Sequence, residues 1–306
     1  MGRTIGVMGM GHVGSTVAHI IVAQGLCDTL VLYDHDKEKV NADTLDFQDA
    51  ASLLPTHTNI INGQISDMKD CDIIISAIGR IDLIKVGNVD RFVELKTNAP
   101  GVKEISAELK ESGFHGILLA ITNPNDVITN LYQKYTGFPT NKVLGTGTYL
   151  DTSRLKRHVG EALGVDPRSV SGYVLGEHGD SQFAAWSTVR VEGRPFAEIA
   201  KEKGIDLDKL EVETRFGGGT VHAGKGYTNY AVATAATSLA QIILSDAKTE
   251  AICSHYNEEF NGYISSPAII GKDGVERVLT LPLTDEENQH LKESAETIKE
   301  KTERFG

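Results

Sequence analysis

The length and composition of the chain indicate a globular protein of about two domains, with 306 residues, of which 40% are hydrophobic and 24% charged. A formal net charge of −12 argues against a nucleic-acid partner, because phosphate backbones are bound by clustered cations, and no apolar run approaches the ~20 residues of a membrane span. The three cysteines lack a metal-binding spacing and the N-terminus lacks a signal-peptide pattern, so we expect reduced thiols, no metal site and a cytoplasmic protein.

The first half of the chain alternates short apolar runs with longer segments of helical periodicity. The apolar runs are rich in Ile, Leu and Val without polar alternation, which is typical of strands covered on both faces; they are residues 5–8, 30–33, 73–77, 117–121 and 143–144. Between them we expect a helix that stops at Gly25, a second over Lys37–Ala51 and a third over Asp90–Ser112. The alternation predicts an α/β fold with a doubly wound parallel sheet and right-handed crossovers.

The second half mixes hairpin and helix signals, which predicts an α+β domain. Thr284 and Glu287 have the spacing of a capping box at the start of a charged helix. The expected elements are a hairpin entered at 189–193, a hairpin over 269–281 that turns at Lys272-Asp273-Gly274, one long helix over 222–244 and a C-terminal helix over 284–303. We place the domain boundary between residues 147 and 148, which gives domains of 1–147 and 148–306.

A glycine motif follows the first predicted strand and opens the first predicted helix. Residues 9–14 have the G-x-G-x-x-G spacing, in which the glycines allow a tight turn, close approach of a pyrophosphate, and close packing of helix on strand. Asp34 ends the second strand 20 residues after Gly14, where a carboxylate holds a ribose 2′-OH and repels a 2′-phosphate. We interpret residues 1–147 as a Rossmann domain that binds NAD; the alternative is a tight turn and a solvated aspartate. The expected cofactor contacts are Gly9, Gly11, His12, Val13, Gly14 and Asp34.

Three side chains in the second half could perform acid–base chemistry on a small carboxylate. Asp151 and Arg154 lie at i and i+3 of a predicted helix, so they share a face on which the aspartate could orient a histidine and the arginine could bind a carboxylate. His178 lies in a predicted loop, and histidine is the usual acid–base residue near neutral pH. The alternatives are a surface ion pair between Asp151 and Arg154, and a His178 that is one of ten histidines without a catalytic role.

In this order and at this spacing, the motifs resemble those of the L-lactate and malate dehydrogenase family. The resemblance covers nearly the whole chain and is carried by the glycine motif, Asn123-Pro124 after a strand, Leu150-Asp151-x-x-Arg154 and Gly176-Glu177-His178-Gly179-Asp180-Ser181. Within the family, the stretches 111–116, 137–139 and 265–271 resemble the bacterial L-2-hydroxyisocaproate dehydrogenases. The resemblance implies an NAD-dependent oxidoreductase that interconverts 2-oxo acids and L-2-hydroxy acids.

The resemblance also implies a homotetramer and a role for individual residues. Each assignment is carried to the position that matches the family's motif. The implied roles are His178 as general acid–base, Asp151 as the group that holds and stabilises its imidazole, Arg91 as the group that polarises the carbonyl, Arg154 as the ligand of the substrate carboxylate, Asn123 as a contact of substrate and cofactor ribose, Thr228 as a wall of the substrate pocket, and Val232 as a neighbour of the nicotinamide.

The preferred substrate depends on the loop between Gly79 and Arg91 and on a glycine run. Malate dehydrogenases carry an arginine at the loop tip, whereas between Gly79 and Arg91 this chain has an arginine only at the loop base, Arg80, so a dicarboxylate is disfavoured. The loop is long and apolar, and Gly217-Gly218-Gly219 leave room where the family's substrate side chain lies. We favour a branched aliphatic substrate such as 2-oxoisocaproate; the glycines could instead form only a flexible turn. The alternative functions are an L-lactate dehydrogenase and, more remotely, a non-catalytic NAD-binding protein.

Overall fold

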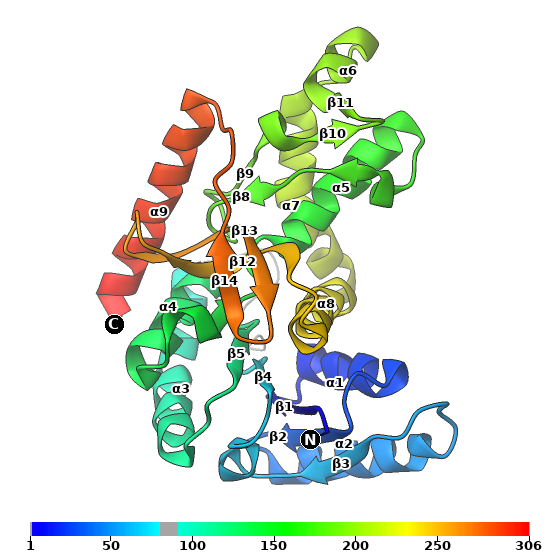
Figure 1. Cartoon of the computed structure of the whole chain (residues 1–306), viewed down its shortest axis with the longest axis vertical. Coiled ribbons are helices and arrows are strands. Elements are labelled where there is room, and N and C mark those ends of the chain that lie inside the picture. Colours follow the sequence, from blue (N-terminus) through cyan, green and yellow to red (C-terminus); the bar gives the residue numbers. More distant parts are fainter. Residues whose placement is uncertain (1, 80–90, 306) are drawn as a thin grey trace.

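One large sheet forms the centre of the molecule and takes strands from both halves of the chain (Figure 1). The structure is a computed structural model that describes residues 2–79 and 91–305, with the side chains of residues 91 and 92 outside that description. Within these residues the strand order is β14-β13-β12-β6-β5-β4-β1-β2-β3. The strands are β1 (Thr4–Met8), β2 (Thr29–Tyr33), β3 (Asn59–Asn62), β4 (Ile73–Ser76), β5 (Ile117–Ala120), β6 (Val143–Gly145), β12 (Thr249–Asn257), β13 (Gly262–Gly271) and β14 (Gly274–Val278).

Strands β1 to β6 run parallel, as their uninterrupted apolar runs predict. Every residue of β4 and β5 is buried, because helices cover both faces of the sheet. The five predicted strands are confirmed to within two residues at each end. Strand β3 was not predicted; only Ile60 of its four residues is buried, so it shows neither a continuous apolar run nor a regular alternation. The parallel arrangement brings the carboxyl ends of these strands to one edge of the sheet.

The helices of the first half follow the strands as the prediction requires. Helix α1 stops at Gly25, whose φ of 61° lies in the left-handed region that favours glycine. Helix α2 covers the range predicted for it, and α3, described from Arg91 onward, ends at Ser112 as predicted. The four helices are α1 (His12–Gln24), α2 (Lys37–Ala51), α3 (Arg91–Ser112) and α4 (Asn125–Thr136).

The second half has helices and short antiparallel sheets, which confirms the α+β prediction. The β13–β14 hairpin turns at Lys272 and Asp273 as predicted. In the C-terminal helix the capping box is present, with Thr284 N donating to Glu287 Oε2 over 2.9 Å and Glu287 N donating to Thr284 Oγ1 over 3.2 Å. The remaining elements are α5 (Tyr149–Leu163), α6 (Phe196–Lys203), α7 (Leu207–Lys225), α8 (Tyr230–Ser245), α9 (Asp285–Phe305), β7 (Val170–Ser171), β8 (Val174–Leu175), β9 (Phe183–Ala184), β10 (Arg190–Val191) and β11 (Arg194–Pro195).

The prediction of one helix from His222 to Leu244 is wrong. Helix α7 ends at Gly226, which has a φ of 83° and donates its N–H to the carbonyl of His222 over 2.8 Å. Helix α8 begins only at Tyr230, so Thr228 lies in the connection between two helices. The alternative reading of Gly217-Gly218-Gly219 as a flexible turn is also wrong, since the three glycines lie inside α7.

The two halves share a hydrophobic core. One buried cluster contains Ile5 and Leu119 from the parallel strands together with Leu239 of α8 and Ile270 of β13. Strand β12 joins β6 antiparallel at Ser254 and Gly145, which extends the sheet across the predicted boundary at 147/148. That boundary stays a prediction. The two domains that it defines have different expected roles but share one hydrophobic core.

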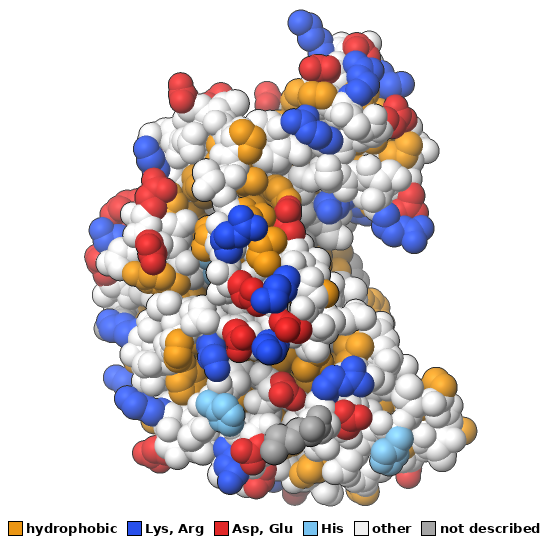
Figure 2. Space-filling view, viewed as in Figure 1, with side chains coloured by type: hydrophobic (Ala, Val, Ile, Leu, Met, Phe, Trp, Pro, Cys, Tyr) orange, Lys and Arg blue, Asp and Glu red, His pale blue; other side chains and the backbone are white. Residues whose placement is uncertain are grey.

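Charged side chains of both signs are interspersed over the face of the molecule drawn in Figure 2. They do not gather there into one extended basic or acidic patch. No helix of the described residues is long and apolar enough to cross a bilayer.

Candidate active site

A cavity of about 270 Å³ lies at the carboxyl ends of β1, β4, β5 and β6. One wall consists of residues that directly follow these strands, among them Gly11, Ile78 and Asn123. The opposite wall comes from the second half of the chain and includes Arg154 of α5 and His178. A ligand here would lie at the edge where doubly wound sheets bind their ligands, because the loops of all the parallel strands meet there.

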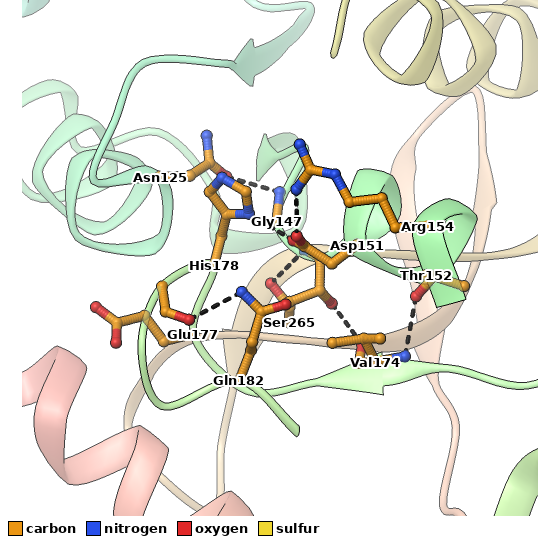
Figure 3. Close-up of polar contacts among 12 residues, drawn as sticks. Asn125, Gly147, Asp151, Thr152, Arg154, Val174, Glu177, His178, Gln182 and Ser265 are labelled. Carbon is orange, nitrogen blue, oxygen red and sulfur yellow. Dashed lines mark hydrogen bonds and ion pairs between the residues drawn. The ribbon is translucent and has the colours of Figure 1, made fainter. Parts of the chain in front are cut away.

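His178, Asp151 and Arg154 form one chain of polar contacts in this cavity (Figure 3). The Nδ1 atom of His178 lies 2.5 Å from Asp151 Oδ2, and Nη1 of Arg154 donates to Asp151 Oδ1 over 2.8 Å. The Asp151 side chain is fully buried, and those of His178 and Arg154 are 17% and 15% exposed. Asp151 and Arg154 thus share a helix face as predicted, and their ion pair is buried rather than on the surface.

His178 and Arg154 together influence the charge of Asp151. Burial by itself would raise the pKa of this carboxyl, but His178 and Arg154 lower the pKa below its ordinary value by stabilising the carboxylate. Asp151 is therefore ionised at neutral pH and can stabilise a positively charged imidazole. Because Nδ1 of His178 is directed to Asp151, Nε2 is the ring nitrogen that can exchange a proton with a ligand.

The loop that carries His178 is fixed by its backbone. The N–H of His178 donates to Asp126 Oδ2 over 2.7 Å, and Oδ1 of the same carboxylate accepts from Ser265 Oγ over 2.8 Å. Gly176 forms an antiparallel bridge with Ser265. Burial raises the pKa of Asp126, while the backbone N–H of His178 and the hydroxyl of Ser265 act against that rise by donating hydrogen bonds. These contacts anchor the histidine to α4 and β13.

The glycine motif has the shape that a dinucleotide requires. Gly9 has a φ of 88°, and a Cβ on Gly14 would lie 1.7 Å from the Gly9 carbonyl oxygen, so neither position accepts a side chain. A Cβ on Gly11 would meet no atom within 4 Å, which leaves open space in front of the N-terminus of α1. His12 and Val13 line the cavity.

Asp34 lies where a ribose-binding carboxylate is expected. It follows β2, is 6% exposed, and accepts from Met10 N over 2.6 Å and from Asp36 N over 2.9 Å. The carboxylate is thus tied to the glycine turn and keeps lone pairs for a ribose hydroxyl. This donor and acceptor set fits NAD, with its pyrophosphate at the N–H groups of α1 and its adenosine ribose at Asp34.

The other predicted site residues fall into two groups. Asn123, Thr228 and Val232 line the cavity, and the backbone oxygen of Asn123 accepts from Asn98 Nδ2 over 2.9 Å. The backbone of Arg91 belongs to α3, but its side chain and the whole loop 80–90, with Arg80, lie outside the described residues. The glycine run faces Arg154, because a Cβ on Gly218 would lie 3.0 Å from Arg154 Nη2.

Comparison with known proteins decides the family. A model of the lactate/malate dehydrogenase NAD binding domain matches residues 3–145, and a model of the lactate/malate dehydrogenase alpha/beta C-terminal domain matches residues 148–305. The chain belongs to the lactate/malate dehydrogenase family. The predicted family, the Rossmann fold and the NAD cofactor are thereby confirmed, and the chain is an oxidoreductase of this family.

Relatives match the chain over almost its full length. The L-lactate dehydrogenase of Fusobacterium nucleatum is 35% identical over 97% of this chain and 95% of that protein. L-lactate dehydrogenase 3 of Bacillus cereus is 36% identical over 99% of this chain and 98% of that protein. The crystal structure of the minor L-lactate dehydrogenase from Enterococcus mundtii, 30% identical, matches with a TM-score of 0.93 over 99% of this chain and 98% of that chain.

Sequence reasoning missed Arg215 and His222 of this dehydrogenase cavity. They line it from the same face of α7 as Gly218 and Gly219, which were predicted to leave room for the substrate, and the spacing of three, four and seven residues is that of a helix face. A helix predicted over 207–225 would have pointed to them. Among the described residues, no three or more His, Cys, Asp or Glu side chains are grouped to hold a metal ion.

Proposed function

We propose that the chain is an NAD-dependent L-2-hydroxycarboxylate dehydrogenase, which reduces 2-oxo monocarboxylic acids reversibly to L-2-hydroxy acids. The chain of contacts from Arg154 through Asp151 to His178 carries the proposal. It combines a cation for a carboxylate with a histidine whose charged form has a partner, in the same cavity as the glycine motif. A non-catalytic NAD-binding protein would need neither group.

The mechanism follows from the protonation of His178. NADH, when bound, supplies the hydride that reduces the carbonyl carbon. Protonated His178 donates its Nε2 proton to the carbonyl oxygen, which becomes the hydroxyl of the product. Asp151 stabilises the imidazolium before the transfer and holds the ring afterwards. In the reverse direction neutral His178 accepts the hydroxyl proton.

The remaining roles concern the position of the substrate. Arg154 binds its carboxylate, since a guanidinium matches a carboxylate in a bidentate pair. Arg91 polarises the carbonyl, as the family resemblance implies. Asn123 contacts substrate and cofactor ribose, Thr228 lines the substrate side of the cavity, and Val232 lies on its nicotinamide side.

For the substrate we propose a branched or bulky aliphatic 2-oxo acid such as 2-oxoisocaproate, as in L-2-hydroxyisocaproate dehydrogenases. Gly218 and Gly219 line the cavity, and a Cβ on Gly219 would meet no atom within 4 Å, so space remains at this face of α7. The alternative is L-lactate dehydrogenase, which is the name of the relatives in Fusobacterium nucleatum and Bacillus cereus.

A substitution in the glycine face tests the substrate proposal. Gly219→Val should lower kcat/KM for 2-oxoisocaproate by about tenfold or more, because the added methyl groups occupy the space proposed for its isobutyl group. The same change should lower kcat/KM for pyruvate less than threefold. Gly224→Val, in the same helix and likewise without a neighbour within 4 Å of the added Cβ, lies outside the cavity lining and serves as control. Equal losses for both substrates would contradict the proposal.

We also propose a cytoplasmic homotetramer. Large apolar side chains are exposed on α2, α7 and α8, among them Leu45 (54%), Phe216 (60%) and Tyr230 (70%), and contact between copies would cover them. Light scattering should give a mass of about four times 33.1 kDa. A monomer at micromolar concentration would contradict this assembly.

A further inference from the structure

A buried ion pair lies directly beside the proposed catalytic histidine. The side chain of Glu177 is 2% exposed and contacts Nζ of Lys301, whose side chain is 14% exposed. Lys301 comes from the C-terminal helix α9, 124 residues away in sequence. In a buried ion pair each charge offsets the hydration that the other has lost, so removal of one partner leaves an uncompensated buried charge.

The carboxylate of Glu177 is folded beneath its own loop. Its Oε2 accepts from Ser181 Oγ over 2.8 Å, and its backbone N–H donates to Ser294 Oγ of α9 over 2.7 Å. A Cβ on Gly179 would lie 2.7 Å from Glu177 Cδ, and one on Gly176 would lie 2.6 Å from Ser294 Oγ. The two glycines thus leave the space in which Glu177 packs under the loop and against α9.

Two described carboxylates close to His178 each contact a cation: Asp151 contacts Arg154, and Glu177, its neighbour in sequence, contacts Lys301. Burial raises the pKa of Asp126, which binds the backbone of His178. Other titratable groups of the described residues around the cavity and loop are Glu94 of α3, Arg215 and His222 of α7, His12 of α1, Tyr227 after α7, the loop residue Asp180 and His290 of α9.

We propose that Lys301 is a positioning residue for His178. Lys301 neutralises Glu177, so that Asp151 is the carboxylate that governs the charge of the histidine. This inference rests on the proposed acid–base role of His178. Without Lys301, an uncompensated carboxylate one residue from His178 would favour the imidazolium and loosen the loop from α9. His178 would then stay protonated to higher pH, and reduction of the 2-oxo acid would be slower.

The test compares four variants with the wild type. Lys301→Met removes the charge and keeps the stem, Lys301→Arg keeps the charge, and Glu177→Gln with Lys301→Met removes both charges. Lys299→Met is the matched control, because Lys299 lies on the same helix, is 54% exposed, and pairs only loosely with Glu296 at 3.8 Å. Reduction of 2-oxoisocaproate and pyruvate is followed over about pH 5.5 to 9.5.

The expected result is a pH shift that depends on the charge of Glu177. In Lys301→Met the alkaline limb of the kcat/KM profile should move up by about half a pH unit or more, and kcat should fall about threefold or more. Lys301→Arg and Lys299→Met should superimpose on the wild type, and the double variant should return the limb to its wild-type position. An unchanged limb in Lys301→Met, or a shift that persists in the double variant, would overturn the proposal.

A binding measurement separates this proposal from the proposed function. Oxamate, an unreactive analogue of pyruvate, is titrated into the NADH complex over the same pH range, and NADH fluorescence reports its affinity. If the wild type binds oxamate but reduces no 2-oxo acid, the proposed function fails, while the alkaline limit of oxamate binding still tests Lys301. If oxamate binding is lost at the same alkaline pH in the wild type and in Lys301→Met, the proposed role of Lys301 is overturned and the proposed function is not.

Discussion

Replacing Asp151 by Asn removes the charge that holds His178 and leaves a side chain of the same shape. Asp151 is fully buried and receives contacts from His178 at 2.5 Å and from Arg154 at 2.8 Å. Each charge-assisted hydrogen bond contributes about 1.5–3 kcal/mol. We expect the neutral amide to forfeit about 2–3 kcal/mol of the stabilisation of the imidazolium, because an amide oxygen can still accept from Nδ1 but carries no full charge.

This loss corresponds to a decrease of about 30- to 160-fold in kcat/KM for 2-oxo acid reduction at neutral pH. The alkaline limb of the pH profile should also move to lower pH, since the protonated histidine loses its counter-charge. Stopped-flow NADH oxidation measures both effects, and NADH fluorescence titration serves as the control for cofactor binding. A loss of less than threefold, or a loss confined to the affinity for NADH, would refute the assignment of Asp151.

Three further predictions concern His178, Asp34 and the pH dependence of the Asp151 contacts. His178→Asn should bind NADH with an unchanged dissociation constant yet lose turnover by about a thousandfold or more, as expected when the general acid is removed; near-normal turnover would exclude His178 from this role. Asp34→Ala should raise the KM for NADH about tenfold and narrow the NADH to NADPH preference, since the carboxylate that repels a 2′-phosphate is gone; an unchanged preference would count against the ribose site. The pKa of Asp151 is lowered in the folded state, so the ionised carboxylate stabilises the fold above the unfolded-state pKa of about 3.9, and this stabilisation is lost as pH falls through the folded-state pKa. The difference in unfolding free energy between wild type and Asp151→Asn, measured by urea denaturation, should therefore shrink below about pH 4. A difference that stays constant with pH would be inconsistent with the lowered pKa.

The Rossmann half could be predicted because its signals are local. Each parallel strand is a short apolar run, and the glycine motif occupies a fixed place between β1 and α1. The stop predicted for α1 at Gly25 and the range predicted for α2 are confirmed. Strand β12 was not predicted, because polar residues such as Ser254 and His255 interrupt its run; both are buried through contacts with distant parts of the chain.

Site residues that belong to a sequence motif were predicted, whereas contacts that form only when distant segments pack together were missed. The shared helix face of Asp151 and Arg154 follows from their spacing, and His178 from its surrounding motif. The contact between Glu177 and Lys301 joins residues 124 positions apart, so no local pattern indicates it. The break between α7 and α8 was missed because Gly226 was read as part of a helix, although its left-handed backbone ends α7 and places Thr228 in the connection.

The central claim is tested most directly by kcat/KM with NADH for 2-oxoisocaproate, pyruvate and oxaloacetate, measured side by side with chiral analysis of the product. We expect L-2-hydroxy acids as products and a kcat/KM about tenfold or more higher for 2-oxoisocaproate than for pyruvate, which is about 1.4 kcal/mol. The kcat/KM for oxaloacetate should be the lowest of the three. A preference for pyruvate would replace the substrate proposal by L-lactate dehydrogenase and leave the roles of His178, Asp151 and Arg154 in place. Oxaloacetate as the best substrate, or no NADH oxidation with any of the three, would contradict the claim itself.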